Sequence, residues 1–282
     1  MMRYSRTKIV ILIIIFAVLW ISTCVNEKLP YADETEVRID VQSDSVMITS
    51  SMENVLRIMS AEGDEIRIES GGDEKSISGT TYKVDNPSDA VIFIPSSYTD
   101  ISVNAIERIE VSSLEGSSLS INNINGGIGI ADVKAKDLSV ISVSGDISIS
   151  GTNCSGLLEI RNTSGDIFIH DNSLHDIDIE STSGDILFGN TDGHECMADL
   201  KNGDISAEGL NLSSFTADVL NGSISLTSVS APYIKLSNMN GDVTLSLEDA
   251  QEYTKVINSV KSEGDLSKRM EIEAGNGDVI FL

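Results

Sequence analysis

The chain has 282 residues, of which 44 are acidic and 19 basic, so its formal net charge is −25. This charge and a pI near 4.2 argue against nucleic acid and anionic lipid surfaces as direct partners, because both would repel the protein. Aromatic residues make up only 5% of the sequence, which indicates an interior filled by aliphatic side chains.

Residues 1–24 have the layout of a targeting segment. A positively charged start is followed by 13 consecutive apolar residues, 9–21, a run of signal-peptide length. As a helix this run would span about 20 Å, short of the roughly 30 Å of a bilayer core. Residues 21–24 resemble the end of a bacterial or archaeal lipobox, which makes Cys24 the candidate lipid-attachment residue.

Three fates of this segment are open. Cleavage at the lipobox would leave a lipoprotein anchored through Cys24, and this is the fate we favour. Thr23, in place of the usual Gly, Ala or Ser, counts against cleavage, and an uncleaved membrane anchor is the second possibility. Ordinary secretion is the third. In the first two cases we expect residues 25–35 to form a tether, with the membrane as a partner at the N-terminus. The rest of the chain would lie in a prokaryotic cell envelope, on the outer face of the cytoplasmic membrane or at the cell surface.

Residues 36–115 predict an irregular β region that caps a stack of strands and forms its first turns. Leu56 and Ile58 stand before Gly63 at the spacing of the repeat that follows, seven and five residues before the glycine. A second turn, without a glycine corner, is predicted from four apolar residues: Ile101, Val103, Ile109 and Val111. We expect this region to cover the edge of the stack, which would otherwise invite pairing with another chain.

From residue 116 to 282 a Ser/Asn-Gly-Asp signature recurs, with glycines 19 or 20 residues apart and once 36 apart. A period of this length is typical of stacked repeats whose units contact only their neighbours. The corner-forming glycines are Gly126, Gly145, Gly165, Gly184, Gly203, Gly222, Gly241 and Gly277. Glycine suits a tight corner because it adopts positive φ without a Cβ clash. In the long gap, residues 248–262 are mostly polar, and we expect a helical turn or two there.

Four apolar columns flank each glycine, at seven and five residues before it and at two and four after it. The spacing of two within each pair is the alternation of a strand with one buried face. These columns predict an all-β fold, a single-stranded parallel β-helix (β-solenoid) with rungs of about 19 residues. A hairpin meander or a propeller is the rival fold, and the seven residues between the second and third columns are too many for a two-residue hairpin loop.

An aspartate column follows the glycines, and its clearest members are Asp146, Asp166, Asp185 and Asp204. Carboxylates stacked about 4.8 Å apart repel by roughly 0.9 kcal/mol per pair even in bulk water. Two kinds of interaction would offset this repulsion. Each aspartate accepts backbone N–H bonds at its own corner, as in Asx turns, or Ca²⁺ or Na⁺ lies between rungs. We favour the first, so no cofactor is predicted, and Ca²⁺ binding by this ladder is the alternative.

The other cysteines and the three histidines predict no reactive site. Cys196 falls in a core column, whereas Cys154 is expected in a turn about 10 Å away, beyond disulfide reach. His170, His175 and His194 are expected to be solvated turn residues, because one His-x-Cys pair is a weak metal signal. No serine-hydrolase elbow, zinc-protease motif or Walker loop is present, so no catalytic residue is predicted.

The repeated Ser-Gly-Asp-Ile pattern behind a signal segment, most regular from Gly126 to Leu247, resembles a known group of domains. These are the adhesin-like β-solenoid domains of unknown function, relatives of the "head GIN" domains of prokaryotic cell surfaces. The resemblance covers residues 36–282. It implies a single-stranded parallel β-helix and an envelope location, and it attaches no catalytic residue to the motif.

These features favour a non-enzymatic surface protein that binds cells, envelope polymers or a protein ligand through a long β face. An enzyme is disfavoured because the corners are too short to build a cleft and basic side chains are sparse. The alternative is an envelope scaffold or stress sensor that acts with a membrane partner.

Overall fold

The computed structural model describes residues 36–51, 55–77, 80–85, 90–247, 253–258, 260–261 and 268–282. Throughout these ranges the secondary structure is β, from β1 to β27, with no helix. Accordingly, no helix long and apolar enough to span a membrane occurs among the described residues. Cys24 and the expected tether 25–35 lie outside them, so the targeting segment stays a prediction.

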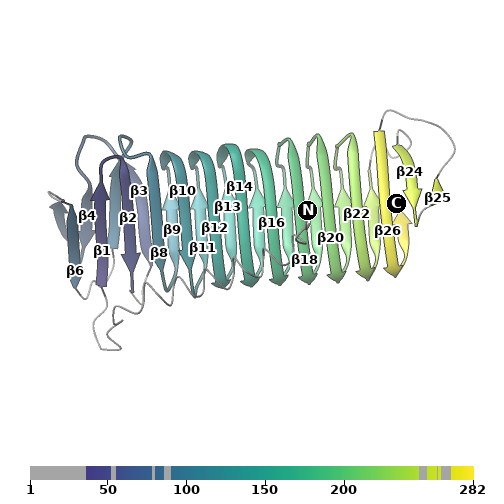
Figure 1. The fold of residues 1–282 in the computed structure, drawn as a ribbon, viewed down its shortest axis with the longest axis horizontal. Coiled ribbons are helices and arrows are strands. Elements are labelled where there is room, and N and C mark those ends of the chain that lie inside the picture. Colours follow the sequence, from purple (N-terminus) through teal and green to yellow (C-terminus); the bar gives the residue numbers. More distant parts are fainter. Residues whose placement is uncertain are drawn as a thin grey trace, which may run out of the picture. The chain divides into compact units, whose positions relative to one another are not determined.

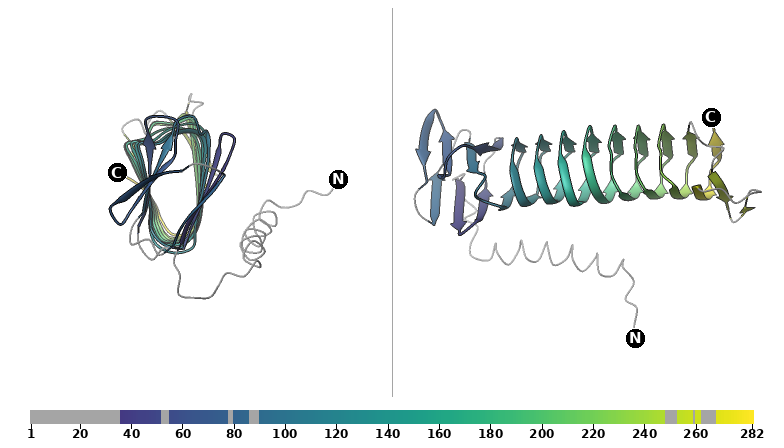
Figure 2. Two further views of the ribbon diagram at one scale, coloured as in Figure 1. Left: turned by 90° about the vertical axis from the view of Figure 1, so that its left-hand side faces the viewer. Right: turned by 90° about the horizontal axis from the view of Figure 1, so that it is seen from above.

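The described strands form two long sheets, and the chain passes from one to the other within each rung (Figure 1). Sheet 1 has 14 strands and sheet 2 has 13. Viewed along the stack, the rungs superimpose (Figure 2). The fold is the predicted β-solenoid, with about eight turns and rungs of about 19 residues.

Parallel pairing joins the strands of the regular stack. In sheet 1 they are β8 (Asp100–Ala105), β10 (Glu115–Asn123), β12 (Lys134–Ser144), β14 (Asn153–Ser164), β16 (Ser173–Ser183), β18 (Glu195–Asn202), β20 (Ser214–Asn221), β22 (Tyr233–Asn240) and β26 (Lys268–Asn276). In sheet 2 they are β9 (Ile109–Ser112), β11 (Ile128–Ala131), β13 (Ile147–Ser150), β15 (Ile167–His170), β17 (Ile186–Gly189), β19 (Ile205–Glu208), β21 (Ile224–Thr227), β23 (Val243–Ser246) and β27 (Val279–Phe281).

The register places like residues directly above one another, which confirms the four apolar columns. Ile186 pairs with Ile167 on one side and with Ile205 on the other, and all three are fully buried. The rung without a glycine corner is also confirmed, since Ile101 pairs with Leu119 and Ile109 with Ile128. The core is therefore a set of aliphatic columns that run the length of the stack.

A third side of each rung, missed by the sequence analysis, lies opposite the glycine corner. We call it the far bend, and it runs from seven residues after one glycine to eight before the next, for example residues 172–176 and 191–195. Its buried column mixes polar and apolar residues: Val133, Thr152, Asn172, Thr191, Leu210 and Val229. Inside it the Asn172 amide donates to Ile149 O at 3.1 Å and accepts from Thr152 N at 2.8 Å. Cys154 lies in this bend, as expected of a turn residue, and its side chain is buried there.

Before the regular stack, the strands change direction. They are β1 (Glu36–Gln42), β2 (Ser45–Ser50), β3 (Leu56–Ala61), β4 (Arg67–Ser70), β5 (Asp73–Ser76), β6 (Thr81–Asp85) and β7 (Ala90–Pro95). Antiparallel pairing joins β1 to β2 and β6, and β4 to β5 and β7. These strands lie at one end of both sheets (Figure 1).

The predicted register of Leu56 and Ile58 was wrong. They lie in sheet 2, where they pair with Ile109 and Val111, and not in the sheet 1 columns before a glycine corner. The physical reason is that Gly63 makes no corner between sheets. The chain returns to sheet 2 as β4 and pairs antiparallel with β7.

Near the C-terminus, the expected helical turns were also wrong for the residues that the structure describes. Strand β24 (Tyr253–Ile257) runs parallel to β26, and β25 (Val260–Lys261) folds back on β24. Tyr253 is buried and its hydroxyl donates to Ala231 O at 2.7 Å. The segment extends sheet 1 through its pairing with β26, and the Tyr253 contact also ties it to the preceding rung.

Candidate functional site

The glycine corner brings the backbones of successive rungs into close contact. Seven of the eight predicted corner glycines have φ between +86° and +144°, the region that other residues avoid, and Gly277 is the exception. From Gly145 onward, an added Cβ would overlap the carbonyl oxygen of the glycine one rung earlier. Gly126 would instead meet the backbone of Arg108. The glycines are needed for close approach as well as for the turn, and this role is structural.

The aspartate ladder follows the same corner, and its hydrogen bonds run between rungs. Asp146 Oδ1 accepts from Asp166 N at 2.9 Å, and the same contact joins Asp166 to Asp185 and Asp185 to Asp204. The expectation of an acceptor bond to backbone N–H therefore held, but the donor belongs to the next rung and not to the same corner. Each carboxylate thus links two rungs, which offsets part of the repulsion along the column.

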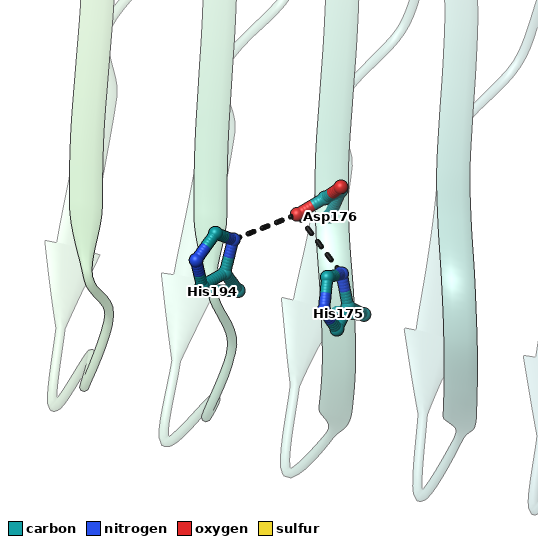
Figure 3. Close-up of side chains that lie close together, drawn as sticks. All are labelled: His175, Asp176 and His194. Carbon is teal, nitrogen blue, oxygen red and sulfur yellow. Dashed lines mark hydrogen bonds and ion pairs between the residues drawn. The ribbon is translucent and has the colours of Figure 1, made fainter.

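One cluster of potential metal ligands converges elsewhere in the described ranges, at the far bend. It consists of His175 and Asp176 on β16 and His194, the residue before β18. The Nδ1 atoms of both imidazoles point at Asp176 Oδ1, at 3.1 Å from His175 and 3.2 Å from His194 (Figure 3). The two rings are stacked, with centroids 5.0 Å apart. The ligand atoms all lie within 4.8 Å of one another.

The local backbone explains why two consecutive side chains, His175 and Asp176, both reach the surface. Leu174 and Ile177 are buried on either side of them, so the inward–outward alternation of the strand is interrupted at the bend. His194 occupies the equivalent position one rung later, where its N–H donates to His175 O at 2.7 Å. This pair was not predicted from the sequence, although the spacing of 19 residues between the histidines equals one rung.

Neither His170 nor Cys196 belongs to this cluster. His170 pairs with Asp171 at 3.1 Å and does not belong to the cluster. Cys196 is fully buried, whereas His194 is exposed, so the His-x-Cys pair faces two different environments. The expectation of solvated histidines is correct for exposure, but it overlooked the convergence of two of them on one carboxylate.

Beside the far bend, sheet 1 presents a group of outward carboxylates that we call the acidic face. Its members are Glu159, Asp178, Glu180, Asp199 and Asp218, on four neighbouring strands. Arg161 lies among them and contacts Asp178 at 3.0 Å, Glu159 at 3.2 Å and Glu180 at 3.5 Å. Asp199 and Asp218 form no ion pair with any described residue. The face thus has five carboxylates for one guanidinium.

In the acidic face, Asp199 is the carboxyl whose pKa is raised by its surroundings. The pKa of its carboxyl is raised to about 6, mainly by desolvation and also by repulsion from Asp218, Glu180 and Asp178, while Arg161 opposes the shift. The side chain still contacts water, so solvent screens these charges. The part of the shift that comes from the three carboxylates reflects the excess of negative charge on this face.

Comparison with known protein families identifies the family of the chain. The family profile described as Toastrack DUF4097 matches residues 31–279. The chain belongs to the Toastrack DUF4097 family. No curated protein and no solved structure matches it. The family is one of unknown function.

Two further features of this Toastrack DUF4097 chain bear on its chemistry. Burial raises the pKa of the Cys154 and Cys196 thiols, which disfavours the reactive thiolate. One hollow of about 330 Å³ is lined by Glu69, Ser70, Gly72, Glu74 and Val91, and another of about 410 Å³ lies beside Asn238 and Asn258. Neither lining includes a histidine, cysteine, lysine or arginine.

Proposed function

We propose that this chain is a non-enzymatic binding protein of the cell envelope, of the adhesin type. Its acidic face would bind cationic groups on neighbouring cells, envelope polymers or surface proteins. The observation that carries this proposal is the excess of carboxylates on one continuous side of sheet 1, where neither Asp199 nor Asp218 forms an ion pair with a described residue. Such a surface attracts cations and speeds their encounter with the protein.

The regular spacing of the rungs supports a polymeric or extended ligand. Neighbouring strands in a sheet lie about 4.8 Å apart, so equivalent carboxylates recur at a fixed interval along the stack. Asp199 and Asp218 are direct register partners on β18 and β20. An extended chain that carries repeated positive charges can contact several rungs at once, and its affinity then gains from multivalency.

The envelope location in this proposal rests on residues 1–24, with Cys24 as the candidate lipid-attachment residue. The resemblance of the repeat to adhesin-like domains of cell surfaces, including the "head GIN" group, supports the same location. We propose a non-enzymatic role because the corners between strands are short and the linings of the two hollows include no histidine, cysteine, lysine or arginine.

Co-sedimentation of the full-length protein with intact cells and isolated envelope material tests this function. We expect saturable binding that weakens as salt is added, because the contact is electrostatic. Replacing Asp199 and Asp218 together by Asn should reduce binding several-fold. A matched control removes two charges elsewhere, with Glu65→Gln and Glu208→Gln, and should leave binding close to wild type.

Two outcomes of this experiment would contradict the proposal. If the protein binds neither cells nor envelope material, with or without Ca²⁺, the adhesion function is wrong. The remaining candidate would then be a scaffold or stress sensor, and crosslinking to membrane proteins would be the next measurement. If the control variant loses as much binding as the Asp199/Asp218 variant, the acidic face is not the contact surface.

A further inference from the structure

We propose that His175, Asp176 and His194 form a binding site for a divalent transition-metal ion, with Zn²⁺ as the ion that suits them best. The site would lie on the solvent side of the far bend and bridge two successive rungs. It uses none of the residues of the acidic face, so it stands or falls independently of the proposed function.

The donor atoms are those that such an ion selects. Imidazole nitrogen and carboxylate oxygen bind Zn²⁺ at about 2.0–2.2 Å, which places the ligand atoms of a tetrahedral site about 3.3 Å apart. The observed separations from Asp176 Oδ1 are 3.1 Å to His175 Nδ1 and 3.2 Å to His194 Nδ1 (Figure 3). The third separation is within the 4.8 Å that encloses the whole cluster. An ion therefore fits between the three side chains with only small side-chain movement.

The backbone holds the three ligands at fixed positions. His175 and Asp176 are adjacent on β16, and the hydrogen bond from His194 N to His175 O ties the second rung to the first. Strand pairing continues immediately beyond the site, where Asp176 is the register partner of Glu195. A second carboxylate therefore stands on the neighbouring strand, next to His194. A site on paired strands is pre-organised, which lowers the entropic cost of binding.

Stability alone does not account for this arrangement. The side chains of His175, Asp176 and His194 are 53%, 43% and 59% exposed. Exposed pairs of this kind contribute little to folding free energy. The whole chain has only three histidines, and two of them converge on the same carboxylate oxygen. Binding of one ion by the three donor atoms would explain this convergence.

The coordination would be incomplete, and this sets the behaviour of the site. With three protein ligands, a tetrahedral ion keeps one position for water or for a group from another molecule, unlike a closed structural zinc site. Imidazole also makes the site selective, because Ca²⁺ and Mg²⁺ prefer oxygen ligands. We therefore expect reversible binding of Zn²⁺ that excess Ca²⁺ does not displace.

Isothermal titration calorimetry with Zn²⁺ tests the proposal, on full-length protein without an affinity tag, in mild detergent and stripped with a chelator. One equivalent should bind to the wild type. His175→Ala and His194→Ala should each weaken binding at least tenfold, and the double variant should lose it. His170→Ala is the matched control, because it removes an exposed histidine that also pairs with an aspartate, and it should bind as the wild type does.

Two results would overturn the site. One is a double variant that takes up Zn²⁺ as strongly as the wild type, and the other is an equal loss in His170→Ala. Because the three ligands are exposed, the variants should keep the β-sheet circular dichroism spectrum of the wild type. Asp176→Asn gives a further check, since it preserves the side-chain shape and should weaken binding through loss of the anionic oxygen.

Discussion

The glycine corner and the far bend occupy opposite sides of the same rung, yet the residues that they require differ. At the corner the same residue returns in every regular rung, because the backbones of successive rungs touch and no Cβ fits between them. At the far bend the position of His175 is taken by Gly156 in the rung before and by His194 and then Ser213 in the rungs after. Repetition therefore marks positions that build the stack. Outward positions that vary are free to carry individual chemistry.

The largest effect on stability should come from a charged side chain placed in the buried apolar columns of the two sheets. Ile205 is fully buried between Ile186 and Ile224, so Ile205→Asp should cost about 4 kcal/mol or more and can prevent folding. Its outward neighbour provides the control, because Ser206→Ala should change the free energy of unfolding by less than about 0.5 kcal/mol. Urea denaturation measures both, and equal losses would show that the register is wrong.

Next in size is a single methyl group at the corner. Gly203 has φ +134°, and an added Cβ would overlap the Gly184 carbonyl oxygen. Gly203→Ala should therefore destabilise the protein by roughly 2–4 kcal/mol. Gly156→Ala at the far bend is the comparison. There φ is not positive, and the added Cβ would meet the Asp137 carboxylate, a side chain, and would lie 2.8 Å from the Lys136 carbonyl oxygen, compared with a closer approach to the Gly184 carbonyl oxygen at Gly203. We therefore expect a smaller loss in thermal denaturation. A larger loss at Gly156 would contradict the distinction between the two sides.

A smaller effect is expected from the aspartate ladder. Asp185→Ala removes the acceptor of the Asp204 N–H and should cost about 1 kcal/mol, whereas Asp185→Asn keeps an acceptor oxygen and should be nearly neutral. Because backbone N–H groups already satisfy these carboxylates, Ca²⁺ should leave the Tm unchanged. A Tm that rises with Ca²⁺, and does so less in Asp185→Asn, would restore the cation account.

The smallest effect is electrostatic and depends on pH. The pKa of Asp199 is raised from 3.8 to about 6 in the folded protein, so the folded state holds a proton that the unfolded state has lost between these values. Stability should therefore fall as pH rises from about 4 to about 6. Asp199→Asn should be the more stable protein at pH 7 and equal to the wild type near pH 3.5. Solvent screening keeps the gain below about 1 kcal/mol. Thermal melts across this range provide the measurement, and a gain that is independent of pH would contradict it.

Much of the regular stack could be predicted from the sequence, because its physical causes recur at one spacing. Apolar residues such as Ile186 and Ile205 mark the buried face, and the glycines mark the close contact between rungs. The N-terminal strands were harder to predict, since Leu56 and Ile58 imitate the repeat while Gly63 makes no corner. Local spacing cannot show which sheet a strand joins when the pairing turns antiparallel.

The candidate metal site was missed for a different reason. The far bend contains buried polar residues such as Asn172, whose partners are backbone groups of the neighbouring rung, so its columns carry no simple hydrophobic signal. The bend also interrupts alternation, and consecutive residues then face outward together. The distance of one rung between His175 and His194 was visible in the sequence. Their shared carboxylate emerged only once the bend was known.

The far bend is also the place where rung length varies. The rung from Gly145 to Gly165 is one residue longer than its neighbours, and the extra residue is taken up beside Gly156, where the register of β14 shifts. The 36-residue interval between Gly241 and Gly277 opens at the same place and holds β24 and β25. Beyond each insertion the columns return to their former register. Foreign loops or affinity tags grafted at this bend should therefore leave the stack intact, so the solenoid can serve as a display scaffold with a defined insertion point in every turn.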